Sequence, residues 1–274
     1  VYYSVYNDIR EALNRDTIVR GDAIYLSIQP QFRIYDENSK PVKTPSYKAF
    51  LGFQSIIKTN NNNFLTAALE SGHFSNGQSG SAFSEELEDN TPESTALYED
   101  LTDDTDLAAI LNRSSGNFST NLTRLSLNYR INKFNDENLP ETIHSLTLTY
   151  QLYHRRFLGA FQFGGYNPED IDIYGRHQIE ASYEFTSHLK GFRYTLGQEV
   201  FLHPDVHPSA EVFRSETTAI VYPWDKDLGI FAKFAFGYDD YNYRFVDSFP
   251  RFSIGLTWDW FTPFVVKPNR VTNP

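Results

Sequence analysis

The chain alternates apolar and polar residues with a period of two, in segments about ten residues long, and this pattern limits its fold more than any other feature. Successive side chains of a β-strand point to opposite faces, so each such segment predicts a strand with one apolar and one polar face. In the segment Ile173–Phe185, one parity holds Ile179, Ala181, Tyr183 and Phe185, and the other holds Gln178, Glu180, Ser182 and Glu184.

Ten segments of this kind follow one another, separated by stretches rich in Asn, Asp, Gly and Pro. A further segment, Val1–Asn7, is a candidate eleventh strand. The ten predicted strands are Ala23–Tyr35, Ser46–Lys58, Asn63–Gly77, Phe118–Asn132, Ser145–Tyr153, Ile173–Phe185, Arg193–Leu202, Val212–Tyr222, Gly229–Tyr238 and Arg251–Trp260.

The surroundings of these strands are a separate question, because a soluble two-sheet sandwich alternates in the same way. No apolar run reaches the roughly 18 to 20 residues of a membrane-spanning helix, so any crossing must be made by strands. Aromatic residues make up 16% of the chain and gather near segment ends, as in the interfacial girdle of a membrane barrel. We therefore expect an all-β, antiparallel transmembrane β-barrel over residues 23–261, an N-terminal segment over 1–22 and a tail over 262–274.

The charge of the chain is concentrated in one predicted loop. Between Ser79 and Gly116 there are ten carboxylates and one arginine, so this loop carries −9 of the net −11. An acidic protein is a poor partner for nucleic acid. Most such charge runs are solvated, which is the interpretation that we prefer here. Cysteine is absent and no basic leader precedes Val1, so we expect a processed, exported chain without thiol chemistry.

Long and short connections alternate along the chain. Barrels of the bacterial outer membrane have long extracellular loops and short periplasmic turns, so the long connections predict the extracellular end. These are Ser79–Gly116, Arg155–Asp172, His203–Ala210 and Asp239–Pro250. In one of them, His203 and His207 flank Asp205, but histidines in proline-flanked loops are mostly exposed, and we do not expect a metal there.

Polar residues interrupt the apolar row of one predicted strand. In Asn63–Gly77 the parity of Leu65 and Leu69 continues into His73 and Ser75, so an imidazole and a hydroxyl are expected on the lipid-facing side. Asn121 has the outward parity in the next strand. Pairing the two strands with Asn121 opposite His73 also places Leu125 opposite Leu69 and Leu127 opposite Ala67.

These three residues are the parts of an activated serine nucleophile. His73 would take the proton of Ser75, and Asn121 would fix the imidazole tautomer. An uncharged orienting group suits a lipid-facing wall, where a carboxylate would be costly to desolvate. The alternative is that the three side chains simply lie at the headgroup level, where polar residues are common.

At these positions the sequence resembles the outer-membrane phospholipase A family. The resemblance is carried by His73-Phe74-Ser75-Asn76-Gly77, by Asn121-Leu122-Thr123-Arg124-Leu125 and, more weakly, by the segment 47–53. It implies a twelve-stranded, dimeric, calcium-dependent barrel enzyme. It also implies Ser75 as nucleophile, His73 as base, Asn121 as the orienting residue and the Gly77 amide as an oxyanion donor.

Two departures concern the calcium that the resemblance implies. The loop between the Ser and Asn motifs is about forty residues long instead of a few, and Gln78 replaces the family's Arg. The backbone carbonyl of Gln78 can still be a ligand, and Ser39 is a candidate for the missing serine ligand. Carboxylates of the loop 79–116 are a further source of oxygen ligands.

The sequence thus predicts a phospholipase of the bacterial outer membrane that hydrolyses acyl esters of membrane phospholipids. Two alternatives stay open. One is a catalytically inactive barrel that serves as a structural or accessory subunit of a larger outer-membrane complex; the other is a passive pore. The chain could also form a homodimer.

Overall fold

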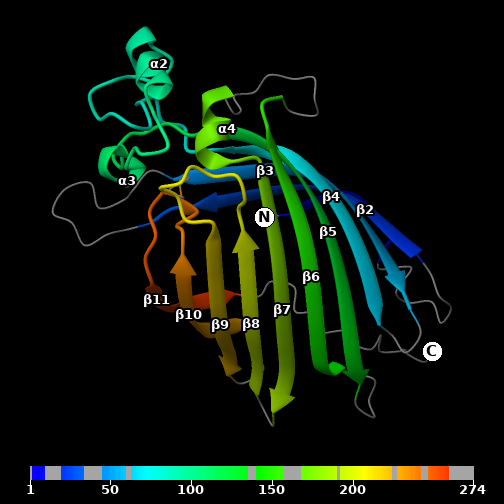
Figure 1. The fold of residues 1–274 in the computed structure, drawn as a ribbon. Coiled ribbons are helices and arrows are strands. Elements are labelled where there is room, and N and C mark those ends of the chain that lie inside the picture. The colour runs from blue at the N-terminus through cyan, green and yellow to red at the C-terminus, as the bar shows by residue number, and fades with distance from the viewer. Residues whose placement is uncertain are drawn as a thin grey trace, which may run out of the picture.

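The protein forms a single antiparallel sheet of eleven strands in which every strand is hydrogen-bonded to its neighbours in the sequence (Figure 1). The computed structural model describes residues 2–9, 20–33, 45–59, 63–134, 140–156, 168–189, 192–223, 227–241 and 246–258. The strands are β1 (Tyr2–Asn7), β2 (Arg20–Gln31), β3 (Ser46–Lys58), β4 (Phe64–Ser75), β5 (Ser119–Phe134), β6 (Pro140–His154), β7 (His177–Leu189), β8 (Phe192–Leu202), β9 (Phe213–Pro223), β10 (Leu228–Gly237) and β11 (Arg251–Trp258).

This order confirms the all-β, antiparallel prediction and excludes the two-sheet sandwich for the described residues. The sheet curls around an interior, with β2–β4 behind β7–β10 in Figure 1. Among the described residues, β1 pairs only with β2 and β11 only with β10. No pairing between β1 and β11 is present among these residues, so a closed barrel is not shown. No helix of the described residues is long and apolar enough to cross a membrane.

The predicted strands agree with the observed ones except at a few ends. Val1–Asn7 does supply an eleventh strand, β1. One prediction was wrong: Ile173 and Tyr174 do not begin a strand but end the helix α4 (Pro168–Tyr174). Ile173 has the apolar parity of β7, but α4 ends before Gly175, whose φ of 66° is easy only for glycine.

The two faces of the sheet differ in the way that the alternation predicts. The outer face carries exposed aliphatic and aromatic side chains, whereas the inner face carries ion pairs. Glu70 pairs with Arg124, and Glu216 pairs with Arg214 and Lys233. Exposed members of the outer face on β4–β6 are Leu65, Leu69, Leu125, Leu127, Tyr129, Leu146, Leu148 and Tyr150; we call this set the apolar belt.

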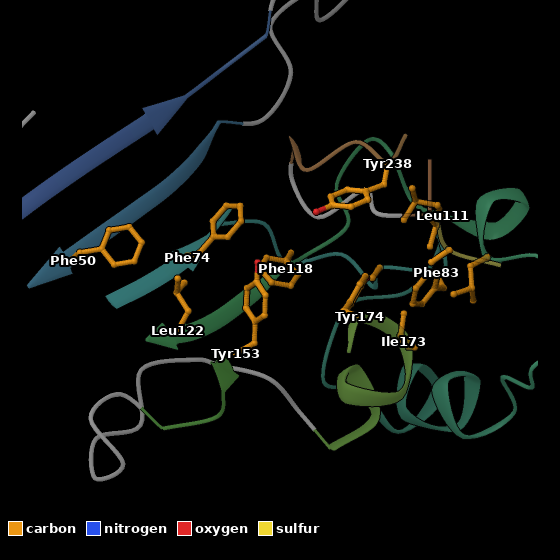
Figure 2. Packing of buried hydrophobic residues seen from close by; sticks show 14 residues of the cluster. Phe50, Phe74, Phe83, Leu111, Phe118, Leu122, Tyr153, Ile173, Tyr174 and Tyr238 are labelled. Carbon is orange, nitrogen blue, oxygen red and sulfur yellow. The ribbon is translucent and has the colours of Figure 1, made fainter. Parts of the chain in front are cut away.

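A cap made from the long connections covers the end of the sheet at which they meet. It contains α2 (Pro92–Glu99), α3 (Leu107–Ile110) and α4, which lie together beyond the ends of the strands (Figure 1). Leu107, Phe83 and Tyr174 of the cap are almost fully buried and join a cluster with Phe74 and Phe118 from the β4–β5 hairpin (Figure 2). The loop 79–116 is therefore anchored by apolar packing.

The carboxylates of that loop nevertheless lie where the charge pattern predicts. Nine of the ten are exposed, and Asp89 is half-buried. Asp106 caps the N-terminus of α3, and Asp89 accepts a hydrogen bond from the side chain of Asn117 at 2.6 Å. Most of these carboxylates are therefore solvated, and Asp89 and Asp106 also stabilise local structure.

Candidate active site

The candidate site lies at the capped end of β4 and β5, on the outer face of the sheet. His73 pairs with Asn121 across the two strands, Leu69 with Leu125 and Ala67 with Leu127, so the predicted register is confirmed. A one-residue shift would have turned all of these side chains to the other face. The apolar rows of both strands therefore fix the position of the polar pair.

Hydrogen bonds determine the orientation of both members of this pair. His73 Nδ1 lies 3.0 Å from Asn121 Oδ1, and Asn121 Nδ2 donates to the backbone carbonyl of Arg155 at 2.8 Å. A carbonyl can only accept, so it selects the amide orientation that turns Oδ1 toward the imidazole. Nδ1 must then carry the proton, and in a neutral imidazole Nε2 becomes the acceptor. The Asn121 side chain is fully buried, which holds this arrangement in place.

Ser75 lies two residues beyond His73 on the same face of β4. Side chains at this spacing leave a strand about 6.6 Å apart, within reach of a hydrogen bond when the rotamers converge. In the structure the Ser75 hydroxyl is half-exposed and makes no hydrogen bond with a described residue, His73 included. Such bonds are often long in a free enzyme and shorten when substrate binds.

A second serine, Ser71, lies on the same face at the same spacing on the other side of His73. Its hydroxyl lies 3.0 Å from Thr123 Oγ1 and 3.5 Å from the carbonyl oxygen of Leu122, and the residue is buried. Ser71 is therefore held within the sheet, whereas the hydroxyl of Ser75 can turn toward a substrate. This difference favours Ser75 over Ser71 as the nucleophile.

Asn76 joins the two ends of the long loop directly beside Ser75. Its Oδ1 accepts from the Phe118 amide at 2.9 Å and from the Gln78 amide at 3.3 Å, and its Nδ2 donates to the Gly116 carbonyl at 2.7 Å. The side chain is buried. One carboxamide thus joins the two ends of a loop of about forty residues. The ends of β4 and β5 at the candidate site stay paired although the loop between them is long.

Gly77 follows with a φ of 66°, a left-handed conformation that favours glycine. Its amide makes no hydrogen bond with a described residue, so this N–H is available as a donor. Oxyanions of acyl transfer are bound by donors of this kind. The role of Gly77 as oxyanion donor stays a prediction.

The same segment bears on calcium. The carbonyl of Gln78 makes no hydrogen bond with a described residue, so it could serve as a ligand, whereas Ser39 lies outside the described residues. Within the described part of the chain, no group of three or more His, Cys, Asp or Glu side chains could hold a metal ion. The Gln78 carbonyl would be one ligand of a calcium ion, and the chemistry below uses only groups of the protein.

Packing behind the site makes its strands rigid. Phe74, between His73 and Ser75, points inward and is 2% exposed. Its ring packs edge-on against that of Phe118, with the ring centroids 5.5 Å apart (Figure 2). The Lys48 ammonium lies 4.4 Å from the centre of the Phe74 ring. The two catalytic candidates of β4 are therefore held by a buried aromatic residue between them.

Sequence reasoning missed the backbone carbonyl of Arg155, the clamp at Asn76 and the burial of His203 and His207. Contrary to the expectation of exposure, His203 is fully buried and His207 is 5% exposed, with Nε2 2.9 Å from the Thr102 carbonyl oxygen. Both histidines lie beneath the cap. The local sequence gave no signal of the cap's position, although Thr91-Pro92 and Ser94 form a capping box that marks the start of α2.

We compared the chain with family models, curated proteins and solved structures. None of the three comparisons finds a match. The resemblance to outer-membrane phospholipase A therefore depends on the short motifs around His73 and Asn121 and on the weaker match at 47–53, and function must be argued from the site.

Proposed function

We propose that this protein is a phospholipase of the bacterial outer membrane that cleaves acyl esters from its lipid-facing wall. The observation that carries the proposal is the His73–Asn121 hydrogen bond at 3.0 Å, on an outer face that is apolar from Leu69 and Leu125 toward the short turns. A buried asparagine that fixes the tautomer of an imidazole beside a serine is an arrangement that can activate the serine hydroxyl as a nucleophile.

The reaction would proceed in two steps. Ser75 Oγ attacks the ester carbonyl while His73 Nε2 accepts the hydroxyl proton, and collapse of the tetrahedral intermediate breaks the acyl–oxygen bond. His73 returns the proton to the leaving lysophospholipid oxygen. Water, deprotonated by the same imidazole, then hydrolyses the acyl-enzyme to a fatty acid. Gly77 N–H is the proposed donor to the oxyanion.

The position of the site suits this substrate. The apolar belt extends from the site toward the short-turn end of β4–β6, and it offers acyl chains a surface continuous with the bilayer. The proposal therefore includes a closed barrel, twelve-stranded as in the family, with the cap outside the cell. A calcium requirement also remains part of it, with the Gln78 carbonyl as one ligand.

An acylating serine probe tests the proposal, because only an activated hydroxyl reacts at a useful rate. We expect the purified protein, refolded in detergent with calcium, to be labelled at Ser75 and to release fatty acid from phospholipid. Ser75→Ala should abolish both, and His73→Ala should reduce both at least about 100-fold. Ser71→Ala, on the same strand and face, is the matched control and should retain labelling.

The inactive structural subunit is the second candidate, favoured by the missing hydrogen bond between Ser75 and His73. It predicts no labelling of Ser75 with or without calcium, together with stoichiometric partners in gently solubilised membranes. Equal labelling of the wild type and Ser75→Ala would also contradict the proposed mechanism. For a passive pore the interior should conduct ions, although the described inner face is crossed by ion pairs such as Glu70–Arg124.

A further inference from the structure

Three arginines lie together where β6 ends and β7 begins, on strands that are side by side (Figure 1). Arg155 and Arg156 directly follow β6, and Arg176 directly precedes β7. The Tyr153 amide donates to the Arg176 carbonyl at 2.9 Å, which holds the two segments next to each other. All three side chains are exposed.

These guanidinium groups make no ion pair and no hydrogen bond with any residue that the structure describes. Several other arginines of this acidic chain form ion pairs, as Arg113 does with Asp247 and Arg214 with Asp240. Asp172, the exposed carboxylate of α4, is also unpaired with them. Three adjacent cations without a partner among the described residues, in a chain of net charge −11, indicate a surface that meets an external anion.

The arginine group adjoins the candidate site. Asn121 donates to the carbonyl of Arg155 itself, so the backbone that carries the group also orients the residue that holds His73. His154, the last residue of β6, pairs with Asn121 in the register. The cations therefore begin one strand beyond the proposed catalytic pair.

A band of hydrogen-bonded polar pairs lies between the cap end of these strands and the apolar belt. His154 Nε2 lies 3.0 Å from Thr123 Oγ1, and His177 Nδ1 lies 2.7 Å from the Tyr150 hydroxyl, all on the outer face. Polar and aromatic pairs of this kind are typical of the membrane–water interface. The outer face is thus apolar toward the short turns and polar near the candidate catalytic groups. Arg155 and Arg156 follow directly at the cap end of β6, and Arg176 lies beside them, opposite Tyr153.

In a glycerophospholipid an anionic phosphodiester lies beyond the acyl esters and their chains, as Arg155 and Arg156 lie beyond the polar groups and the apolar belt of β6. We propose that Arg155, Arg156 and Arg176 bind the phosphodiester of a membrane glycerophospholipid and so place an acyl ester at Ser75. Arginine suits this role, because its planar fork donates two hydrogen bonds to one phosphate. The inference depends on the proposed phospholipase function for its placement of the ester, but the phosphate binding can be tested without it.

The binding test uses the full-length protein carrying Ser75→Ala, in zwitterionic detergent, titrated with short-chain dihexanoylphosphatidylglycerol by calorimetry. The variant with Arg155→Gln, Arg156→Gln and Arg176→Gln together should bind this lipid about tenfold more weakly or worse, as expected for lost charge-assisted contacts that solvent partly screens. The matched control carries Arg20→Gln, Lys58→Gln and Lys133→Gln, which remove three charges at the short-turn end and should leave binding unchanged.

Measurements of lipid hydrolysis test whether the arginines place the acyl ester at Ser75. In the enzyme with Ser75 intact, the triple arginine variant should raise KM for phosphatidylglycerol about tenfold. Its activity on a diacylglycerol with the same chains, which has no phosphate, should stay within twofold of the wild type. Equal losses on both lipids would mean that the arginines support the fold and not the headgroup, and would overturn the inference.

The remaining outcomes are also decisive. Unchanged lipid binding in the triple variant, or an equal loss in the control, overturns the inference. Competition by inorganic phosphate at the same concentration as the lipid would show a site for free phosphate and overturn the lipid assignment. Arginine-dependent lipid binding without hydrolysis by any form would support the phosphodiester site and contradict the phospholipase proposal instead.

Discussion

At the scale of single residues, the candidate site depends on the orientation of one amide. Asn121 must donate to the Arg155 carbonyl and accept from His73 at the same time, and only a carboxamide of this length does both. We expect Asn121→Ala to lower kcat on phospholipid about 10- to 100-fold, because the imidazole then loses its fixed tautomer and orientation. KM should change little, since Asn121 is buried and does not meet the substrate.

Asn128→Ala is the control for this prediction. Asn128 lies on the same strand but points inward and hydrogen-bonds Ser145 and Thr147. Its replacement should leave kcat within about twofold of the wild type, if the protein folds. A loss of kcat in Asn121→Ala no greater than that in Asn128→Ala would contradict an orienting role.

At the scale of elements, Asn76 is the residue that makes a long loop compatible with a precise hairpin end. Its loss would leave the buried Phe118 amide and Gly116 carbonyl without their side-chain partner, at a cost of about 2 kcal/mol or more. We expect Asn76→Ala to increase proteolytic cleavage within 79–116 and to slow labelling of Ser75. Asn76→Asp, which keeps the acceptor and loses the donor, should be intermediate.

Limited proteolysis followed by mass spectrometry gives the measurement, with Ser79→Ala as control. The Ser79 side chain is exposed, and replacing it should change neither cleavage nor labelling. Should Asn76→Ala resist protease as well as the wild type, the loop would be held by apolar packing alone and the proposed clamp would be wrong.

The strand elements could largely be predicted because one face of each is apolar and a period of two leaves little freedom in register. The pairing of His73 with Asn121 follows from Leu69 and Leu125. The cap could not be predicted in this way, because its packing depends on contacts between loops distant in sequence. Leu107, for example, donates its backbone amide to Ser209 Oγ. For the same reason the Arg155 carbonyl, in a connection without periodicity, gave no signal.

At the scale of the whole molecule, the cap covers the interior of the sheet at one end and buries an imidazole beneath it. The His203 ring lies between those of Tyr153 and Tyr238, at 5.6 Å and 6.0 Å between centroids. Burial, with a smaller contribution from His177, lowers the pKa of His203 to about 4. An unfolded histidine has a pKa of about 6.5. Between these values the unfolded chain binds a proton that the folded protein does not.

The free energy of unfolding should therefore fall as the pH falls from about 6.5 to about 4, by roughly 3 kcal/mol through this group. His203→Phe keeps an aromatic ring between the two tyrosines and cannot be protonated, so its stability should decline less over the same range. Urea unfolding in detergent, followed by tryptophan fluorescence at several pH values, measures the difference. His144→Phe, on the outer face, is the control for the loss of one imidazole. If His203→Phe lost stability with acid as steeply as the wild type, the acid sensitivity of the fold would have to come from other groups, such as the ion pairs of the inner face.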